Sequence, residues 1–332
     1  MFRKGKTMKI FVTGAGGFIG SHVVEQLLAT GNTVRALVHY NGVGRRGFLD
    51  ESNVKSRSRL EIVAGDVRDA HQMSRLVQGC DTVLHLAALI AIPYSYQAAD
   101  SYVATNVQGT LNILEACRSH KVRRVVVTST SEVYGTAQHV PMTEFHPLQA
   151  QSPYAASKIG ADQLALSYYR SHGLPVVVVR PFNTYGPRQS ARAVLPTILT
   201  QILSGRKTIS LGSLTPQRDL TFVTDTARVF LAALGQKGIE GDVIHFGQGS
   251  AVSVEELAEV CFRVLKKRGR IVSVGGRIRP DKSEVNLLLC DATKVREKLG
   301  WEPRVPLEEG IRLTAAYIKE NLATYRPDEY AL

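Results

Sequence analysis

The stretch TSTSEVYG, Thr128 to Gly135, places three polar side chains at the expected end of a buried strand. The apolar run VRRVVVT before it indicates that strand, and Thr130, Ser131 and Glu132 follow it. Side chains two residues apart point to the same side of an extended segment. Thr130 and Glu132 are therefore candidates for one reaction centre. Ser131 would point elsewhere, and its alternative role is a turn hydroxyl that bonds to the backbone.

A second pair of reactive side chains occurs in SPYAASKIGADQ, where Tyr154 and Lys158 are four residues apart. On a helix this spacing puts both on one face. An ammonium group near a phenol favours the phenolate and lowers the tyrosine pKa from about 10, the more so beside an oxidised nicotinamide. Tyr154 would then be a base for a hydroxyl proton during hydride transfer. The spacing alone is common, so the interpretation depends on a nucleotide site elsewhere in the chain.

Such a site is indicated near the N-terminus by VTGAGGFIG, in which Gly14, Gly17 and Gly20 stand between a strand and a helix. Glycines there permit a tight turn and close approach of the backbone, and the helix N-terminus then offers free N–H groups to a pyrophosphate. The position of the motif after the first strand predicts a dinucleotide cofactor.

The second predicted strand does not distinguish NAD from NADP. An NAD enzyme usually has an acidic residue at its end, but TVRALVHYNG offers His39 instead. Arg35, Arg45 and Arg46 are near enough in sequence to receive a 2′-phosphate, so NAD is expected and NADP stays open. Asp66, after the third strand, is placed either for the adenosine or as a helix N-cap.

The elements that position these groups alternate between short apolar strands and amphipathic helices. The strand-like runs are KIFVTG, TVRALVHY, RLEIVAGD, TVLHLAA, VRRVVVTS and PVVVVRPF. This pattern predicts an α/β fold with a doubly wound, Rossmann-type parallel sheet. Turn signals multiply after residue 183, which predicts a nucleotide-binding domain over 1–182 and a smaller substrate lobe over 183–332. DVIHFG reads as a further strand, so segments around 220–247 are expected to return to the first domain.

Composition excludes several classes of function. No apolar run approaches the roughly 18 residues that span a bilayer, and the basic N-terminus reads as a tail, not a signal peptide. The net charge of +12 is not accompanied by a nucleic-acid-binding motif, so an anionic small molecule is the expected partner. Four scattered cysteines without metal spacing predict buried free thiols in a reducing cytoplasm and no metal site.

Taken together, the motifs resemble those of the extended short-chain dehydrogenase/reductases, in particular the NAD-dependent epimerase/dehydratase family that acts on nucleotide sugars. The resemblance covers about residues 8–320. It rests on TGAGGFIG, HLAA, Asn106 in NVQGT, TSTSEVYG, YAASK, RPFNTYGPR and a later RPD. It implies a Rossmann domain with a substrate lobe, and a cytoplasmic homodimer formed by helices around 97–119 and 154–172.

The resemblance also implies roles for particular residues. Thr130 takes the position of the hydroxyl that bonds the reacting sugar hydroxyl, and Glu132 that of the base for the C5 proton in 4,6-dehydratases. Further cofactor contacts fall on Phe18, Ile19, Gly20, His39, Asp66, Val67, Leu86, Ala87 and Ala88. Substrate contacts fall on Tyr94, Asn183, Arg192, Arg218 and Arg279.

The predicted reaction removes water from a nucleotide-linked sugar. Tyr154 takes the C4 hydroxyl proton as hydride leaves, Glu132 removes the C5 proton and protonates the C6 hydroxyl, and the hydride returns to C6. The closest resemblance is to the 4,6-dehydratases of the legionaminic-acid pathway, which implies a UDP- or GDP-linked N-acetylglucosamine. UDP-glucuronate decarboxylase and 4-epimerase are the alternatives. A non-catalytic cofactor sensor is disfavoured because it would be expected to lack Tyr154 or Lys158.

Overall fold

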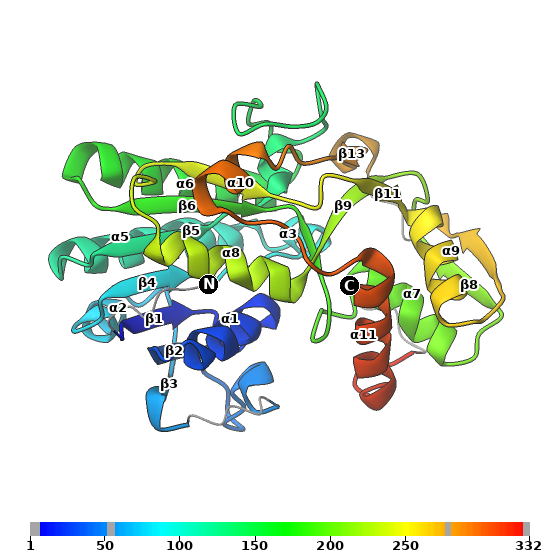
Figure 1. Cartoon of the computed structure of the whole chain (residues 1–332), viewed down its shortest axis with the longest axis horizontal. Helices are drawn as coiled ribbons and strands as arrows, with labels where there is room; N and C mark the ends of the chain where they lie inside the picture. Colours follow the sequence, from blue (N-terminus) through cyan, green and yellow to red (C-terminus); the bar gives the residue numbers. More distant parts are fainter. Residues whose placement is uncertain (1–6, 52–56, 276–279, 328–332) are drawn as a thin grey trace.

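A computed structural model describes residues 7–51, 57–275 and 280–327. Its main sheet has seven parallel strands in the order β10-β6-β5-β4-β1-β2-β3 (Figure 1). Their central segments are rich in valine and isoleucine and are largely buried, as expected for strands covered on both faces. The strands are β1 (Lys9–Thr13), β2 (Thr33–His39), β3 (Leu60–Gly65), β4 (Thr82–His85), β5 (Arg124–Thr128), β6 (Val176–Pro181) and β10 (Val243–Phe246). The predicted doubly wound Rossmann-type fold is confirmed.

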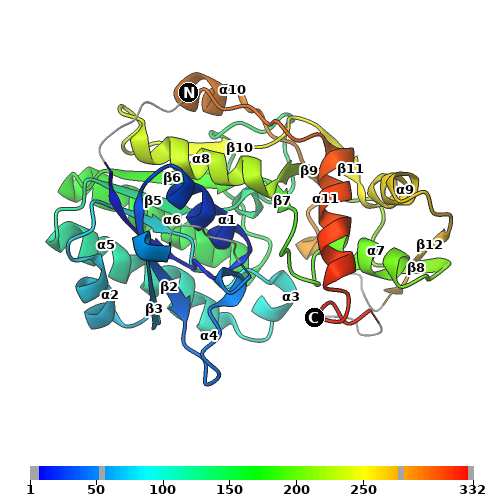
Figure 2. The same cartoon turned by 60° about the horizontal axis from the view of Figure 1, so that its bottom comes forward.

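Helices cover both faces of this sheet. On one face α1 packs against α8, and on the other α5 packs between α2 and α6, as Figures 1 and 2 show. These helices are α1 (Phe18–Ala29), α2 (Ala70–Val77), α5 (Gly109–Ser119), α6 (Pro153–His172) and α8 (Val223–Gly235). The long α6 has defined ends, because the Ser152 hydroxyl accepts from Ala155 N, Pro153 takes the first turn and Gly173 is left-handed.

The helix expected around 97–119 is a run of three consecutive elements. α4 (Ala99–Tyr102) passes into a π-helical segment, η3 (Val103–Gln108), which continues into α5. Short helices connect the remaining parts. They are α3 (Ile92–Ser95), η1 (Gly47–Leu49), η2 (Arg57–Arg59), η4 (Ser131–Tyr134) and η6 (Asp281–Ser283).

The smaller lobe lies beyond the carboxyl ends of the main strands and has its own apolar core. It contains one sheet of β7 (Asn183–Tyr185), β9 (Gln217–Phe222), β11 (Ala251–Ser253) and β13 (Leu287–Leu288), and a pair of β8 (Thr208–Leu211) and β12 (Arg270–Ser273). Its helices are α7 (Val194–Leu203), α9 (Val254–Val264) and α11 (Leu307–Glu320).

The chain does not stay in the smaller lobe after residue 183, because β10 pairs with β6 in the main sheet. α8 also packs against α1, whereas β9 belongs to the small sheet. The chain therefore returns to the first domain at α8 and β10, both of which lie within the segment expected around 220–247. α10 (Thr293–Leu299) packs against β10 and α8. No helix in the described ranges is long and apolar enough to cross a bilayer.

Candidate active site

One large cavity, of about 1510 Å³, opens where the carboxyl ends of the main strands face the smaller lobe. A single small-molecule site usually occupies about 300–1,000 Å³, so this space accommodates two ligands side by side. All predicted site residues except Arg279 line it. They are Gly14, Gly17, Phe18, Ile19, Gly20, His39, Asp66, Val67, Leu86, Ala87, Ala88, Tyr94, Thr130, Ser131, Glu132, Tyr154, Lys158, Asn183, Arg192 and Arg218. Arg279 lies outside the described residues.

The glycine turn has the geometry expected of a phosphate cradle. Gly14 has a φ of 66°, and a Cβ there would lie 2.8 Å from the Ala87 backbone nitrogen. At Gly20 a Cβ would lie 2.1 Å from the Gly14 carbonyl oxygen. Gly17 is the N-cap of α1 and provides no side-chain cap, so the first N–H groups of the helix are left for an anion.

The loop after β4 is fixed against this turn by a buried hydrogen-bond chain. The Thr13 hydroxyl oxygen accepts from the backbone N–H groups of Leu86 and Ala87, at 3.2 and 3.1 Å. It also lies 2.8 Å from His85 Nδ1. Burial lowers the pKa of His85 to about 3, so its ring is neutral and Nδ1 accepts from Thr13. Nε2–H then donates to Thr110 at 3.1 Å.

The far end of the turn carries the groups expected for an adenosine. His39 ends β2, and Asp66 follows β3 with its carboxylate in a fork with Arg68. This guanidinium lowers the pKa of Asp66. The alternative role of Asp66 as an N-cap is wrong, since Asp69 caps α2 by accepting from Gln72 N.

Of the three arginines considered for a 2′-phosphate, only Arg45 lines the cavity. Arg35 is bonded instead to Glu61 on β3, with Nε 2.9 Å from the carboxylate. The residues present therefore fit a dinucleotide diphosphate, on the grounds of the uncapped α1 and of a glycine cradle that a Cβ would fill.

Tyr154 and Lys158 share the inward face of α6, as predicted. Lys158 is buried, and its Nζ donates to the Thr128 carbonyl oxygen at 2.6 Å. Burial lowers the pKa of Lys158, while the nearby Asp162 raises it. Burial raises the pKa of Tyr154, and a hydrogen bond with Thr130 partly offsets the rise. In the protein alone, the desolvation of a buried phenolate therefore outweighs its surroundings. The lowering expected from Lys158 beside an oxidised nicotinamide stays a prediction.

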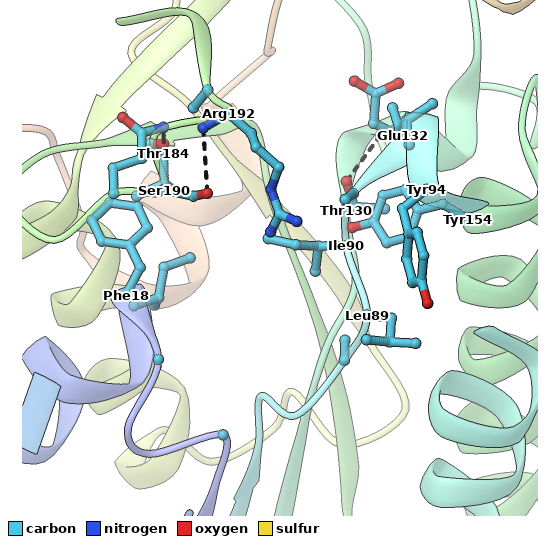
Figure 3. Close-up of a pocket in the computed structure, with 18 of the residues that line it drawn as sticks. Phe18, Leu89, Ile90, Tyr94, Thr130, Glu132, Tyr154, Thr184, Ser190 and Arg192 are labelled. Carbon is cyan, nitrogen blue, oxygen red and sulfur yellow. Dashed lines mark hydrogen bonds between the residues drawn. The ribbon is translucent and has the colours of Figure 1, made fainter. Parts of the chain in front are cut away.

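The TSTSEVYG stretch turns sooner than expected. Its Ser131–Tyr134 portion is the 3₁₀-helix η4, and Thr130 caps it by accepting from Glu132 N at 3.2 Å. The prediction of an extended Thr130–Glu132 segment was therefore wrong. Thr130, Glu132 and Tyr154 nevertheless gather at one wall of the cavity, as Figure 3 shows, and Ser131 lines it as well.

A buried brace holds that strand end to α6. The Ser129 hydroxyl donates to Asp162 Oδ2 at 2.6 Å, and Arg180 on β6 bonds the same oxygen through Nε and a terminal nitrogen, at 3.0 and 2.9 Å. Arg180 also donates to the Tyr134 hydroxyl, which lies 3.0 Å from His245 Nδ1. The brace thus fixes Ser129, which stands between Thr128, the acceptor of the Lys158 hydrogen bond, and Thr130, which is hydrogen-bonded to Tyr154.

The opposite wall comes from the smaller lobe. Asn183 has a buried Oδ1 with no protein partner, so a ligand donor there would satisfy it. Arg218 lies in the cavity wall and pairs with Glu284 at 3.2 Å. Arg192 reaches toward Ile90 across the cavity in Figure 3, and Tyr94 is 46% exposed at its edge.

Sequence reasoning missed several residues of this wall. Gln189 and Ser190 follow the YGPR motif, and Leu211, Gly212, Ser213 and Pro216 line the end formed by β8 and the turn after it. The turn signals after residue 183 include this turn, but no local pattern showed that it lines the cavity. The four cysteines are buried and free, as predicted.

Comparisons with known proteins agree with this geometry. The model of the GDP-mannose 4,6 dehydratase family matches residues 11–314. A dTDP-glucose 4,6-dehydratase from Actinoplanes sp. is 36% identical over 95% of this chain and 98% of its own. Among solved structures, DesIV of Streptomyces venezuelae, a dTDP-glucose 4,6-dehydratase with NAD and TYD bound, superposes with a TM-score of 0.88. It is 34% identical over 96% of this chain and 99% of its own.

Epimerases are structural neighbours as well. One is a UDP-glucuronic acid 4-epimerase from Bacillus cereus, solved with UDP-glucuronic acid and NAD, which superposes with a TM-score of 0.86. It is 30% identical over 95% of this chain and 100% of its own. The family match spans both the nucleotide turn and the YAASK helix. The chain therefore belongs to the GDP-mannose 4,6-dehydratase family of extended short-chain dehydrogenase/reductases.

Proposed function

We propose that the protein is a nucleotide-sugar 4,6-dehydratase that retains NAD and converts its substrate to the 4-keto-6-deoxy sugar. The observation that carries the proposal is Glu132 at the same cavity wall as Thr130 and Tyr154. Removal of the C5 proton and protonation of the leaving C6 hydroxyl both need a general acid–base group beyond Tyr154, which a carboxyl group at this wall provides. A plain 4-epimerisation needs neither step.

Different residues of the chain would hold the cofactor and move the protons. Gly14, Gly17 and Gly20, with the start of α1, would hold the cofactor diphosphate, and Lys158 would face its nicotinamide ribose. When bound, the nicotinamide accepts a hydride from the sugar and later returns it. Tyr154, which is hydrogen-bonded to Thr130, takes the proton of the C4 hydroxyl, and Thr130 would orient that hydroxyl.

Glu132 then acts at the neighbouring carbons. A ketone at C4 makes the C5 proton acidic, so a carboxylate can remove it and pass it to the C6 hydroxyl, which leaves as water. When the hydride returns to C6, a proton returns to C5, and it balances the proton that Tyr154 took from the C4 hydroxyl. Glu132 is half-buried at the cavity wall, where it is open to a substrate yet partly shielded from water.

The substrate carries a diphosphate, and the arginines opposite the nicotinamide end suit its oxygens. We propose a UDP- or GDP-linked N-acetylglucosamine-type sugar, with Asn183, Arg192, Arg218, Arg279 and Tyr94 as its contacts. The Actinoplanes relative is named for dTDP-glucose, so the thymidine nucleotide belongs in the same test.

The test is incubation of the purified protein and NAD with UDP-N-acetylglucosamine, GDP-N-acetylglucosamine, dTDP-glucose and UDP-glucuronate, followed by mass spectrometry. Loss of one water from a nucleotide sugar supports the proposal. Loss of carbon dioxide from the uronate would identify a decarboxylase, and an isomer of unchanged mass would identify an epimerase such as the Bacillus cereus neighbour.

A further inference from the structure

The loop that follows β7 is anchored on α1, although more than a hundred and fifty residues separate them in sequence. A terminal nitrogen of Arg188 lies 2.8 Å from Glu25 Oε1, and its other terminal nitrogen donates to the Ser21 hydroxyl at 3.2 Å. One residue earlier, the Pro187 carbonyl oxygen lies 3.2 Å from His22 Nε2. Three side chains of α1, those of Ser21, His22 and Glu25, thus hold two successive residues of the loop.

The contacts lie in a largely dry environment. The side chains of Arg188 and Glu25 are 11% and 29% exposed. Burial and the Arg188 guanidinium lower the pKa of His22, so the ring is neutral and its Nε2–H donates to Pro187. An ion pair of this kind is costly to break, because either partner alone would stay buried without a counter-charge.

The loop backbone is held in an unfavourable conformation at this point. Arg188 has a φ of 71°, in the left-handed region that non-glycine residues rarely adopt. Strain of this kind persists only where the surroundings over-determine the conformation, and it clusters at functional sites. The fork to Glu25 and Ser21 provides that constraint.

On both α1 and the loop, residues close to this contact line the cavity. Phe18 lines the cavity beside the glycine turn, and its ring packs edge-on against His22, with 6.2 Å between ring centroids. On the loop side, Gln189, Ser190 and Arg192 line the cavity directly after Arg188. Figure 3 shows Phe18 next to Ser190 on the wall that faces Thr130 and Tyr154.

We propose that Arg188 is a positioning residue, whose fork to α1 sets the distance between the cofactor turn and the substrate loop. The inference rests on the proposed function only in that the turn holds a nicotinamide cofactor and the loop a nucleotide sugar. Hydride transfer depends steeply on the placement of the two reacting carbons, and a misplacement of about 1 Å costs roughly 100-fold in rate. Arg188 is not among the residues that line the cavity, so its loss should slow the transfer and leave the binding contacts in place.

The experiment compares Arg188→Gln, Glu25→Gln and the double variant, with Arg188→Lys as a conservative replacement. The control is Arg35→Gln, which removes an ion pair of similar burial, 14% exposed at the arginine, on the outer part of the sheet. Reduction of bound NAD is followed by absorbance in single turnovers, and KM and kcat are measured in steady state. Thermal unfolding of every variant is recorded in parallel.

Arg188→Gln and Glu25→Gln should each slow hydride transfer roughly 10- to 100-fold while KM for the nucleotide sugar changes less than about threefold. The double variant should be no slower than the single ones, because both substitutions break one unit. Arg188→Lys should regain part of the rate, since lysine reaches Glu25 but lacks the fork. Arg35→Gln should leave the rate unchanged.

An unchanged rate in Arg188→Gln would overturn the proposal, and so would additive losses or a rate that falls only as far as the unfolded fraction requires. The same measurements distinguish a failure of the proposed function from a failure of the role of Arg188. If wild-type protein reduces bound NAD but releases no water, the dehydratase assignment fails, while the ratio of variant to wild-type reduction rates still decides the role of Arg188.

Discussion

The proposed role of Tyr154 as a base depends on the groups around its hydroxyl, because a buried phenol loses its proton less readily than an exposed one. Burial raises its pKa, the Thr130 hydrogen bond lowers it, and Glu132 raises it through charge. The rate of sugar oxidation should therefore increase with pH over the range in which the phenolate forms. The positive charge of an oxidised nicotinamide would move this range toward neutrality.

Thr130→Val tests this balance. Loss of the hydroxyl removes the hydrogen bond that lowers the Tyr154 pKa, so the acid limb of the pH–rate profile should move to higher pH. At neutral pH the variant should be roughly 10- to 100-fold slower, and part of the loss should be recovered at alkaline pH. An equal loss at every pH would mean that Thr130 only binds the sugar.

Glu132→Gln separates the two halves of the proposed reaction. The amide cannot accept the C5 proton, so water release should fall by at least roughly 1,000-fold while cofactor binding and sugar oxidation persist. Reduced cofactor should accumulate in single turnovers and be visible by absorbance. Glu51→Gln, at an exposed carboxylate that bonds Tyr317, is the matched control. Full dehydratase activity in Glu132→Gln would show that Glu132 is not the base for the C5 proton.

Among the elements, α6 carries Tyr154 and Lys158, and contacts with β5 and β6 hold it in place. The Asp162 carboxylate on α6 accepts hydrogen bonds from Ser129, which follows β5, and from Arg180 on β6, and all three side chains are buried. Asp162→Ala would leave the Arg180 cation buried without its partner, a loss on the order of 3–5 kcal/mol. Chemical denaturation should show a lower midpoint, and crystallography should show Ser129 displaced. A loss below about 1 kcal/mol would indicate that water replaces the carboxylate.

Strand β9 contains a buried carboxylate with the opposite behaviour from most acids. Burial raises the pKa of Asp219 to about 6 from its usual 3.8, although Gln248, Gly249 and Cys290 donate backbone N–H groups to it. Because the folded pKa is raised, its contribution to stability is full below about pH 4 and is lost as the pH rises through about 6.

Asp219→Asn makes that contribution measurable. The difference in unfolding free energy between wild type and variant should shift in favour of the variant by on the order of 3 kcal/mol between about pH 4 and pH 8. Denaturation curves at several pH values give this difference directly. A difference that is constant with pH would mean that the carboxylate does not titrate in the folded protein.

The sequence predicted those parts of the fold and site that depend on residues close together in the chain. The glycine turn follows directly from strand, glycine and helix signals, and Tyr154 and Lys158 follow from helical spacing. The Arg180–Asp162 and Arg188–Glu25 pairs, separated by 18 and 163 residues, could not be found in this way, because only the folded chain brings them together. The extended form of Thr130–Glu132 was wrong because the Thr130 hydroxyl provides an N-cap that starts a helical turn.

At the scale of the whole molecule, an apolar stripe is left on the outer face of two neighbouring helices. Val103 is 55% exposed, and Val107 and Leu111 follow at intervals of four residues and are half-buried. Gly160 on α6 faces Val107, and Leu164 lies one turn further along α6. A contiguous apolar surface of this kind usually marks a protein interface.

We propose that this stripe forms the homodimer contact implied by the sequence resemblance. Light scattering of the wild type should give twice the chain mass of 36.3 kDa. Val103→Asp places a charge on the most exposed residue of the stripe and should shift the protein to monomers, since an unpaired charge at a buried interface costs several kcal/mol. Phe145→Asp is the control, because Phe145 is 94% exposed on a different loop and should leave the mass unchanged. A monomeric wild type, or a dimer unaffected by Val103→Asp, would assign the stripe another role. Val103, Val107, Gly160 and Leu164 are not among the residues that line the cavity, so the monomer should keep measurable hydride transfer.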